Sequence, residues 1–417
     1  MAKRRVVITG LGTVNPLAWN VESFWEALLE GRSGIRRIQR FDPELFDSQI
    51  GGEVLDWPGV PENRVSKREQ KRLDRFAQFA VGAAIEAVER SALDFGAEDL
   101  DRCGVLIGSG IGGLQELETQ HERMMAKGPS KVSAFTVPKL MVNAASANVG
   151  ILFQLRGLNV AVATACASAT NAIGDALRLI QRDQQDVVIT GGSEAALTKI
   201  GLASFCALRA LSTRNDEPTR ASRPFDKDRD GFVLAEGAGV IVLEELEHAR
   251  ARGANILAEL LGYGATCDAA HITAPDPEGR GAADAIRMAL ADAGVAPEQI
   301  DYVNAHGTGT ELNDVMETRA MKAVFGNHAR NGLLISSTKS AVGHLLGASG
   351  GVEMVAVVKT IQTGWVAPTL NLDEPDAECD LDYCALEKRQ ASVNCAISSS
   401  FGFGGHNVVL VVRKFEG

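Results

Sequence analysis

One cysteine lies where a strand-like segment gives way to a helix-like one, in the run Thr164-Ala165-Cys166-Ala167-Ser168. At the start of a helix, free backbone N–H groups and the positive end of the helix dipole stabilise a thiolate, so this position predicts a lowered cysteine pKa. The cysteine's own N–H could also point at an acyl oxygen. Cys166 is therefore a candidate acyl-accepting nucleophile, and the alternative is a buried thiol that acts only as a small apolar side chain.

Two histidines lie in glycine-rich segments that each adjoin a predicted element. His306 follows a strand within residues 304–310, and His344 precedes a helix within residues 339–350. Either histidine alone is typical of a structural hydrogen-bonding group. Together with Cys166 they predict a thiol site with two partners that could carry protons or stabilise an oxyanion.

A glycine-rich segment, residues 398–407, interrupts the last predicted strand with three glycines and two phenylalanines. Glycine permits a sharp bend and a close backbone approach there. One interpretation is a tight hairpin or β-bulge. The other is a mobile loop that offers a backbone N–H to an oxyanion and uses Phe403 as a gate.

Residues 108–113, Gly-Ser-Gly-Ile-Gly-Gly, match the pattern GxGxxG of dinucleotide-binding loops. The match begins about a hundred residues into the chain, and residues 127–131, at the usual offset of the ribose-binding acid, offer no strand-end carboxylate. The surroundings therefore argue against a dinucleotide site.

The elements that must position these residues alternate between short β-branched runs and amphipathic stretches, which predicts an α/β fold with mostly buried sheets. A boundary is expected near residue 253, between a half 1–253 that carries the cysteine and a half 254–417 that carries both histidines and the glycine-rich loop. A final hairpin is expected over residues 393–414. The predicted strands are 5–9, 103–107, 160–163, 186–190, 240–243, 300–303 and 333–335, and the predicted helices are 22–29, 66–91, 168–182, 281–293 and 349–363.

Bulk properties exclude several classes of function. The 417 residues carry a formal net charge of -11, which disfavours nucleic acid as a partner. No apolar run is long enough for a membrane span and no signal-peptide core is visible, so a cytoplasmic protein is expected. The seven cysteines form no CxxC pair, which argues against a zinc knuckle or a disulfide framework. A basic cluster within residues 64–75 is either a solvated helix face or a docking surface.

The order Cys166, His306, Lys339, His344 and then Phe401-Gly402-Phe403-Gly404-Gly405 resembles that of the elongating β-ketoacyl-acyl-carrier-protein synthases of the thiolase superfamily. The resemblance covers nearly the whole chain, including residues 211–216 and 223–232. It implies a duplicated, five-layered αβαβα fold and a homodimer. It also implies that Cys166 accepts an acyl chain from acyl carrier protein and that malonyl carrier protein then decarboxylates and attacks the resulting thioester.

The same resemblance assigns roles to residues at matching positions. His306 and His344 would stabilise the enolate left by decarboxylation, and the backbone N–H groups of Cys166 and Phe403 would hold the other oxyanion. Lys339 and Glu353 would support the histidines. The remaining assignments are the acyl-pocket residues Ile111, Phe205 and Phe401, the pantetheine-binding residues Thr308 and Thr310, the carrier-docking residues Lys67, Arg68, Lys71, Arg72 and Arg209, and the monovalent-cation residues Asn304, Glu353 and Ser398.

Three relatives of this kind are disfavoured by particular residues. A thiolase needs a second catalytic cysteine where this chain has Phe403, and chain-initiating synthases pair one histidine with an asparagine. A non-catalytic partner like the chain-length factors of polyketide synthases lacks the nucleophilic cysteine. A polyketide-type ketosynthase remains open, as does the acyl chain length. No redox cofactor and no catalytic metal are expected. The one bound ion that the resemblance implies is a structural monovalent cation.

Overall fold

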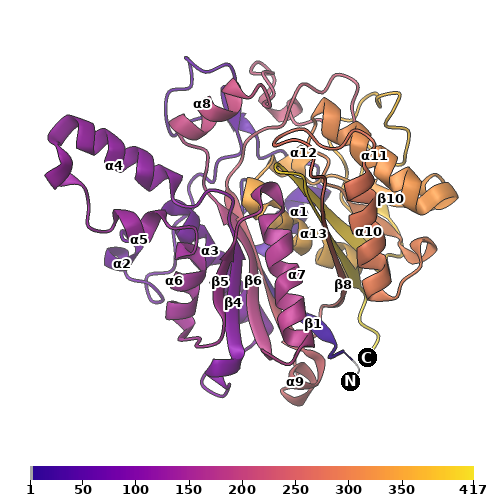
Figure 1. Cartoon of the computed structure of the whole chain (residues 1–417), viewed down its shortest axis with the longest axis horizontal. Helices are drawn as coiled ribbons and strands as arrows, with labels where there is room; N and C mark the ends of the chain where they lie inside the picture. Colours follow the sequence, from indigo (N-terminus) through magenta and orange to yellow (C-terminus); the bar gives the residue numbers. More distant parts are fainter. Residues whose placement is uncertain (1–2) are drawn as a thin grey trace.

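The computed structural model describes residues 3–417, and its main feature is a ten-stranded mixed sheet (Figure 1). Two small two-stranded sheets, β2 (Arg36–Arg37) with β3 (Ile50–Gly51) and β11 (Trp365–Val366) with β12 (Arg389–Gln390), lie apart from it. In sheet order the ten strands are β10 (Leu334–Ser336), β9 (Tyr302–Asn304), β13 (Cys395–Gly402), β14 (His406–Arg413), β8 (Ala258–Cys267), β1 (Val6–Val14), β7 (Gly237–Glu245), β6 (Val187–Glu194), β4 (Cys103–Gly108) and β5 (Asn159–Val162).

The sheet repeats one topology twice. One set consists of the five strands of the N-terminal half. In it β1 pairs antiparallel with β7 and β7 pairs antiparallel with β6, while β6, β4 and β5 run parallel. The strands β8, β14, β13, β9 and β10 follow the same order and the same directions. A short antiparallel pairing of β1 with β8 joins the two sets. The duplication predicted from the resemblance is therefore confirmed.

Helices form three layers around these strands. Helices α7 and α13 pack against strands of both sets and so lie between them, whereas α3 covers β1 and β7 and α10 covers β8 and β14 from outside (Figure 1). This arrangement is the predicted αβαβα layering. The helices are α1 (Val21–Leu29), α2 (Lys67–Gln70), α3 (Arg75–Ser91), α4 (Leu114–Lys127), α5 (Thr136–Leu140), α6 (Ala144–Phe153), α7 (Ser168–Gln181), α8 (Lys199–Ala207), α9 (Leu246–Ala251), α10 (Arg280–Ala293), α11 (Glu311–Phe325), α12 (Lys339–Val342) and α13 (Ser349–Thr363).

The predicted helix over residues 66–91 is wrong because two caps divide it. Ser66 and Glu69 form a capping box that starts the four-residue α2. Asp74 then starts α3, since its carboxylate accepts the backbone N–H of Phe76. The basic residues 67–72 therefore lie on α2 and the turn after it. The other predicted helices and the seven predicted strands match elements of the structure to within a few residues, and the final hairpin is β13 with β14.

A half-buried histidine fastens α9 to the segment before β4. The ring nitrogens of His248 lie 2.9 Å from Glu244 and 2.8 Å from Glu98. The hydrogen bond to Glu244 is the largest of the causes that raise the pKa of His248 from 6.5 to about 9. The charged imidazole therefore ties both carboxylates together at neutral pH.

Replacing His248 with glutamine is expected to lower the free energy of unfolding by about 2 kcal/mol at pH 6. A folded pKa above the unfolded value of 6.5 gives a contribution that is fully present below pH 6.5 and is lost as the pH rises through 9. Urea unfolding of wild type and variant at pH 6, 8 and 10 checks this, since the difference should shrink toward pH 10. An equal difference at all three pH values would mean that the charge of His248 contributes nothing.

Within residues 3–417, the structure has no helix that is both long and apolar enough to cross a membrane.

Candidate active site

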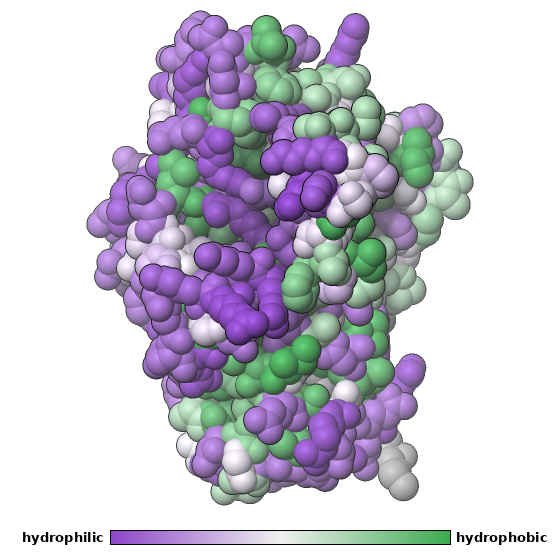
Figure 2. Space-filling model, turned by 90° about the vertical axis from the view of Figure 1, so that its left-hand side faces the viewer, coloured by the Kyte–Doolittle hydropathy of each residue, from purple (hydrophilic) through white to green (hydrophobic). Residues whose placement is uncertain are grey.

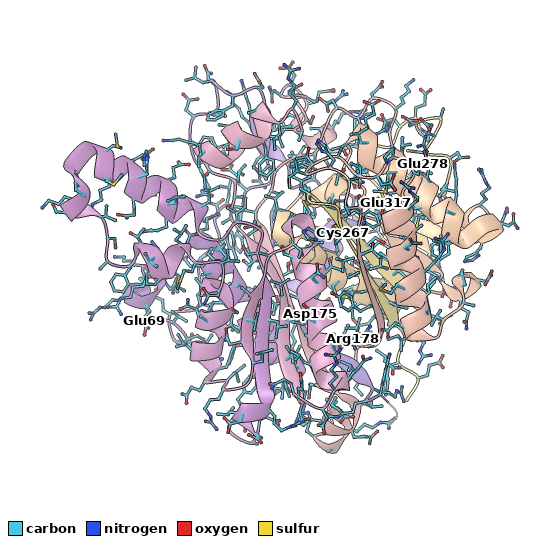
Figure 3. The ribbon with its side chains drawn as sticks, in the orientation of Figure 1. Glu69, Asp175, Arg178, Cys267, Glu278 and Glu317 are labelled. Carbon is cyan, nitrogen blue, oxygen red and sulfur yellow. The ribbon has the colours of Figure 1, made fainter. Side chains whose placement is uncertain are left out.

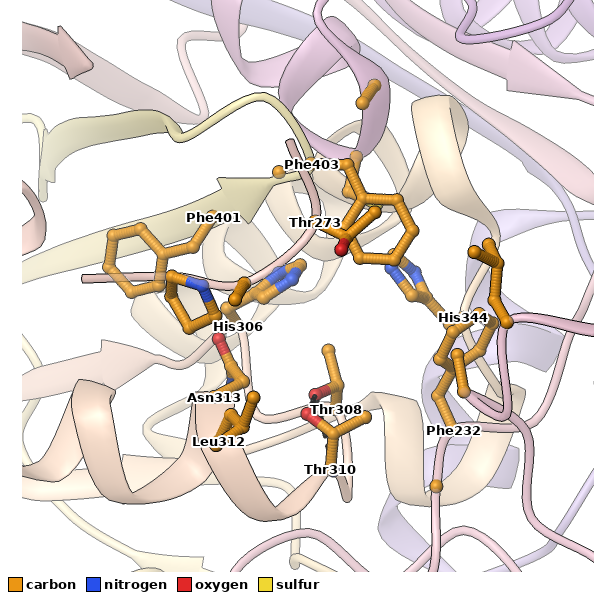
Figure 4. A pocket seen from close by; sticks show the side chains of 18 of the residues that line it. Phe232, Thr273, His306, Thr308, Thr310, Leu312, Asn313, His344, Phe401 and Phe403 are labelled. Carbon is orange, nitrogen blue, oxygen red and sulfur yellow. Dashed lines mark hydrogen bonds between the residues drawn. The ribbon is translucent and has the colours of Figure 1, made fainter. Parts of the chain in front are cut away.

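A cavity of about 550 Å³ is lined by residues from both halves of the chain, and all the predicted catalytic side chains except that of Lys339 line it. Cys166 comes from the turn before α7, His306 from the loop after β9 and His344 from the loop after α12. Figure 4 shows the two imidazoles on either side of the space beneath Phe403. The ring centroids of His306 and His344 are 5.3 Å apart, so one small group between them could contact both.

Cys166 is buried in a 3-10 turn, Ala165–Ala167, that leads directly into α7. Burial raises the pKa of its thiol to about 11, against the charge of Lys339 and the backbone N–H groups of Phe403 and Cys166, which lower it. The predicted lowering of this pKa is therefore wrong, because loss of hydration outweighs the helix start. The two N–H groups nevertheless lie beside the sulfur, where an oxyanion hole for an acyl oxygen on it is needed.

Alkylation of Cys166 by iodoacetamide should accelerate about tenfold per pH unit from pH 6 to pH 9 without reaching a plateau, because the reacting thiolate is a minor species far below a pKa of about 11. Mass spectrometry of the Cys166 peptide measures the rate separately from that of the exposed Cys267. A plateau below pH 8 would show that the resting protein holds a thiolate.

His306 presents one ring nitrogen to the cavity and the other to a buried ammonium group. Lys339 Nζ lies 3.3 Å from His306 Nδ1 and 2.6 Å from the carbonyl oxygen of His306, and it also pairs with Glu353. An ammonium group only donates, so Nδ1 is the acceptor and the imidazole proton resides on Nε2. Burial lowers the pKa of His306 well below 6.5, and the charges of Lys339 and His344 lower it further. His306 is therefore a neutral donor.

His344 is also a neutral donor, but other groups hold its ring. The backbone N–H of Leu346 donates to His344 Nδ1 at 3.2 Å, and Ser349 Oγ lies 2.9 Å from the same nitrogen. Because a backbone N–H cannot accept, the proton of this ring also resides on Nε2. Burial and the charge of Lys339 lower its pKa well below 6.5. Two neutral imidazoles thus direct Nε2–H groups at one space.

Two carboxylates that sequence reasoning missed hold the loop of His306. Glu317, labelled in Figure 3, accepts the backbone N–H groups of His306 and Gly307 at 2.8 Å each. Asp314 accepts those of Thr308 and Gly309 at 3.1–3.3 Å. Both come from the first two turns of α11. Their signal was present in the sequence, since acidic residues soon after a glycine-rich loop can bind its free N–H groups.

The predicted gate forms a tight turn between β13 and β14. Gly404 and Gly405 adopt φ values of 84° and 75°, which favour glycine. The N–H of Gly404 donates to Ile272 O at 2.7 Å, and Gly405 O accepts the N–H of Asp268 at 2.9 Å. A second segment, residues 268–276, therefore holds the turn that carries Phe403. This contact could not be inferred from the sequence, because the bonded residues are 132 and 137 positions apart.

The predicted substrate-binding residues line the same cavity. Ile111 and Phe205 lie on the side of Cys166, and Phe401 lies near His306 with ring centroids 5.9 Å apart. The hydroxyls of Thr308 and Thr310 lie 2.9 Å from each other and face the space below the imidazoles (Figure 4). The cavity thus has an apolar arm beside the thiol and a polar arm at the threonines.

The predicted docking residues lie in two places. Arg209 is at the cavity wall beside Leu208. The others, Lys67, Arg68, Lys71 and Arg72, lie on α2 and the turn after it, where all four are exposed. Lys67 pairs with Glu62 at 2.8 Å and Arg72 lies over the ring of Phe135 at 4.9 Å.

The three predicted cation ligands leave buried oxygens without a hydrogen-bond partner, namely Asn304 Oδ1, Glu353 Oε2 and Ser398 Oγ. Asn304 and Ser398 are register partners on the adjacent parallel strands β9 and β13. Buried polar atoms are normally satisfied, so three orphaned acceptors fit a bound cation. No cluster of three or more His, Cys, Asp or Glu side chains suited to a metal ion occurs among residues 3–417.

The loop that matches GxGxxG has its amides occupied by a protein carboxylate. Gly110 N and Ile111 N donate to Glu194 at 2.6 and 3.3 Å. A carboxyl group of the protein itself therefore lies where a dinucleotide would place its phosphates, which agrees with the interpretation drawn from the sequence.

Comparisons with known proteins give one family. Residues 3–249 match the model of the β-ketoacyl synthase N-terminal domain, and residues 257–373 match that of the C-terminal domain. The chain belongs to the β-ketoacyl synthase family. The 3-oxoacyl-[acyl-carrier-protein] synthase 2 of Synechocystis sp. is 51% identical over 100% of this chain and 99% of its own, and that of Coxiella burnetii is 47% identical over 99% of each.

Solved structures of the family have the same fold. A β-ketoacyl synthase from Burkholderia phymatum superposes with a TM-score of 0.91 at 36% identity, covering 99% of this chain and 100% of its own. A type II polyketide ketosynthase, solved in complex with its acyl carrier protein and bound to a hexaketide, has a TM-score of 0.92 at 34% identity, covering 99% of this chain and 100% of its own. The thiolase-like fold inferred from the sequence is confirmed.

Proposed function

We propose that this protein is an elongating 3-oxoacyl-acyl-carrier-protein synthase, which lengthens a fatty acyl chain by two carbons through decarboxylative condensation. It is a condensing enzyme. The observation that carries this function is the pair of neutral imidazoles, each with an Nε2–H group directed at one space beside a buried cysteine. Such a pair stabilises an enolate without being consumed.

In the first half-reaction, the sulfur of Cys166 attacks the thioester carbonyl of acyl carrier protein. The backbone N–H groups of Cys166 and Phe403 hold the oxyanion that forms. The pantetheine thiolate leaves and takes up the proton that the cysteine loses, so the exchange needs no other reactant. The high pKa of the resting thiol means that this proton must move as the thioester arrives.

In the second half-reaction, malonyl carrier protein loses carbon dioxide and its C–C bonding electrons become an enolate. The Nε2–H groups of His306 and His344 hold the enolate oxygen. The enolate carbon attacks the carbonyl of the acyl group on Cys166, and the thioester bond to sulfur breaks. The cysteine thiolate then takes up one proton from solvent, which restores the resting thiol and leaves a 3-oxoacyl carrier protein.

Each half of the chain supplies one part of this chemistry. We assign residues 1–253 to the half with the nucleophile and residues 254–417 to the half with the two histidines and the gate. The repeated strand topology supports the division, with residues 1 and 2 outside the described part. The cavity at their junction explains why neither half would suffice alone.

The carrier protein is the partner, and the basic residues beside the cavity are its proposed docking surface. Arg209 stands at the cavity wall, and Lys67, Arg68, Lys71 and Arg72 present positive charge from α2 and the following turn. Charge complementarity of this kind speeds association more than it tightens binding. A cytoplasmic location fits substrates carried by such a protein.

A homodimer is supported by an apolar surface along the edge strand β5 and helices α4 to α6. Figure 2 shows this side, where green apolar groups lie among purple polar ones. Met125, Ile151 and Val137 are 72%, 73% and 63% exposed. Exposed apolar area of this kind beside an unpaired strand edge suits a second copy of the chain. Ile151→Glu should lower the mass measured by light scattering to that of a monomer, whereas unchanged mass would contradict this interface.

The residues also fit a bound monovalent cation. The orphaned oxygens of Asn304, Glu353 and Ser398 would hold it, and its positive charge would add to that of Lys339 beside Glu353. Replacing potassium chloride with tetramethylammonium chloride should lower the melting temperature of the wild type but not that of Asn304→Ala. The same loss in both proteins would contradict the site.

The decisive test is condensation by the purified protein. With octanoyl and malonyl carrier proteins it should release carbon dioxide and form 3-oxodecanoyl carrier protein in equal amounts. A polyketide-type enzyme would instead extend its own unreduced product when malonyl carrier protein is in excess. Release of carbon dioxide without acyl uptake, or neither event, would contradict the proposed function.

A further inference from the structure

A buried glutamate that the mechanism does not use connects two segments of the active site. Glu194 ends β6, and no part of its side chain is exposed. Its Oε1 accepts from Ser109 Oγ at 2.9 Å and Ile111 N at 3.3 Å, while its Oε2 accepts from Gly110 N at 2.6 Å and Gly347 N at 3.2 Å. Four donors and no cation make this carboxylate a bridge between the loop after β4 and the turn before α13.

The first of these segments forms a wall of the acyl arm. Ile111 packs in the same apolar cluster as Cys166 and Phe205, and all three line the cavity. An acyl chain that fills this arm from the cysteine therefore contacts Ile111. A movement of the Ile111 side chain displaces the backbone amides of residues 110 and 111, which both donate to Glu194.

The second segment fixes a decarboxylating imidazole. Gly347 follows Leu346, whose N–H sets the tautomer of His344 at 3.2 Å. The two segments also touch directly, since a Cβ on Gly347 would lie 2.3 Å from the nitrogen of Gly110 and 2.7 Å from Glu194 Oε2. The two segments therefore pack without space between their backbones. A shift of one segment must be accommodated by the other, because closely packed groups transmit displacement.

We propose that Glu194 is a positioning residue that couples occupancy of the acyl arm at Ile111 to the placement of His344, so that a filled acyl arm promotes decarboxylation of the malonyl group. This inference rests on the proposed function. With this coupling, the enzyme decarboxylates malonyl groups mainly when an acyl chain is present on Cys166. The coupling is reciprocal, so a malonyl group at the histidines also favours an acyl chain on Cys166.

The test measures carbon dioxide release with the acyl arm filled or empty and with condensation blocked. Octyl methanethiosulfonate converts Cys166 to an octyl disulfide and releases methanesulfinate, while methyl methanethiosulfonate blocks the same sulfur without filling the arm. The parent protein carries Cys206→Ser and Cys267→Ser, because these two cysteines are partly or fully exposed. The ratio of the malonyl carrier protein decarboxylation rates, octyl form to methyl form, reports the coupling.

The parent ratio should be about 5 or more. Glu194→Gln keeps the side-chain volume but turns an NH2 group toward backbone donors, so its ratio should fall to about 1. Glu236→Gln is the matched control, since Glu236 is equally buried but pairs with Arg40 and Arg75. It should keep the parent ratio even if its melting temperature falls.

A parent ratio near 1, or a parent-like ratio in Glu194→Gln, would overturn the coupling. Should Glu194→Gln not fold, Ser109→Ala decides the matter, because it removes one neutral donor to Glu194 and leaves the carboxylate. Its ratio should fall at least about twofold, and an unchanged ratio would equally overturn the inference. A parent that releases no carbon dioxide in either form would instead contradict the proposed function itself.

Discussion

Replacing Cys166 with alanine is expected to lower condensation by about 10⁴-fold or more while malonyl carrier protein still releases carbon dioxide. The sulfur is the only bond-forming group that the first half-reaction takes from the protein. Decarboxylation, in contrast, depends on the Nε2–H groups of His306 and His344, and these stay in place because their Nδ1 partners are Lys339 and Leu346. Radiolabelled octanoyl transfer to the protein and carbon dioxide release from malonyl carrier protein measure the two events separately.

His306→Ala is the matched variant with the opposite expectation. Acyl uptake should stay within about threefold, and carbon dioxide release should fall by about 10²- to 10³-fold, as on removal of one oxyanion donor. The nucleophile and the two enolate donors would then come from different halves of the chain. Loss of both events in either variant, at unchanged melting temperature, would contradict this division of labour.

The strands and long helices were predictable because their hydrophobic patterns are regular and their ends carry clear signals. Helix α7, for instance, buries one apolar face and begins shortly after strand β5. The predicted helix 66–91 was wrong because Asp74 lies within an otherwise helical pattern, and only its contact with the N–H of Phe76 shows that it is a cap. Strand β8 was missed, since its glycines break the β-branched pattern that marks the other strands.

The candidate site shows a similar limit. The residue types of Cys166, His306, Lys339 and His344 and their glycine-rich settings predicted a thiol site. The protonation states did not follow from the sequence, because they depend on burial and on contacts between distant residues. The raised pKa of Cys166 is one such case. The four donors around Glu194 are another, since they come from loops 85 and 153 residues away.

The neutral state of the two imidazoles has a common origin in the cavity. Both rings are enclosed, and the Lys339 ammonium lies between the pair and Glu353. A protonated imidazole beside this ammonium would place like charges together in a poorly solvated space. Burial does most to keep both rings neutral and the charge of Lys339 adds to it, while donation from Lys339 to His306 Nδ1 selects the useful tautomer. Its charge and its geometry contribute separately.

Lys339→Met is expected to lower malonyl decarboxylation by about 10²- to 10³-fold, because the described structure gives His306 Nδ1 no hydrogen-bond donor other than Lys339. Without it the proton can move to Nδ1, and Nε2 then presents a lone pair to the enolate. The same change leaves the Glu353 carboxylate buried without its cation, which costs about 3–5 kcal/mol of stability. Carbon dioxide release and urea unfolding measure the two effects.

The double variant Lys339→Met/Glu353→Gln separates tautomer control from stability. Removing both members of the buried pair leaves no uncompensated charge, so the free energy of unfolding should return to within about 1–2 kcal/mol of the wild type. Decarboxylation should stay low, because the donor to His306 Nδ1 is still missing. If the double variant recovered decarboxylation together with stability, Lys339 would act only by supporting the fold. If stability alone recovered, the ammonium group would be what keeps the proton of His306 on Nε2, where the enolate needs it.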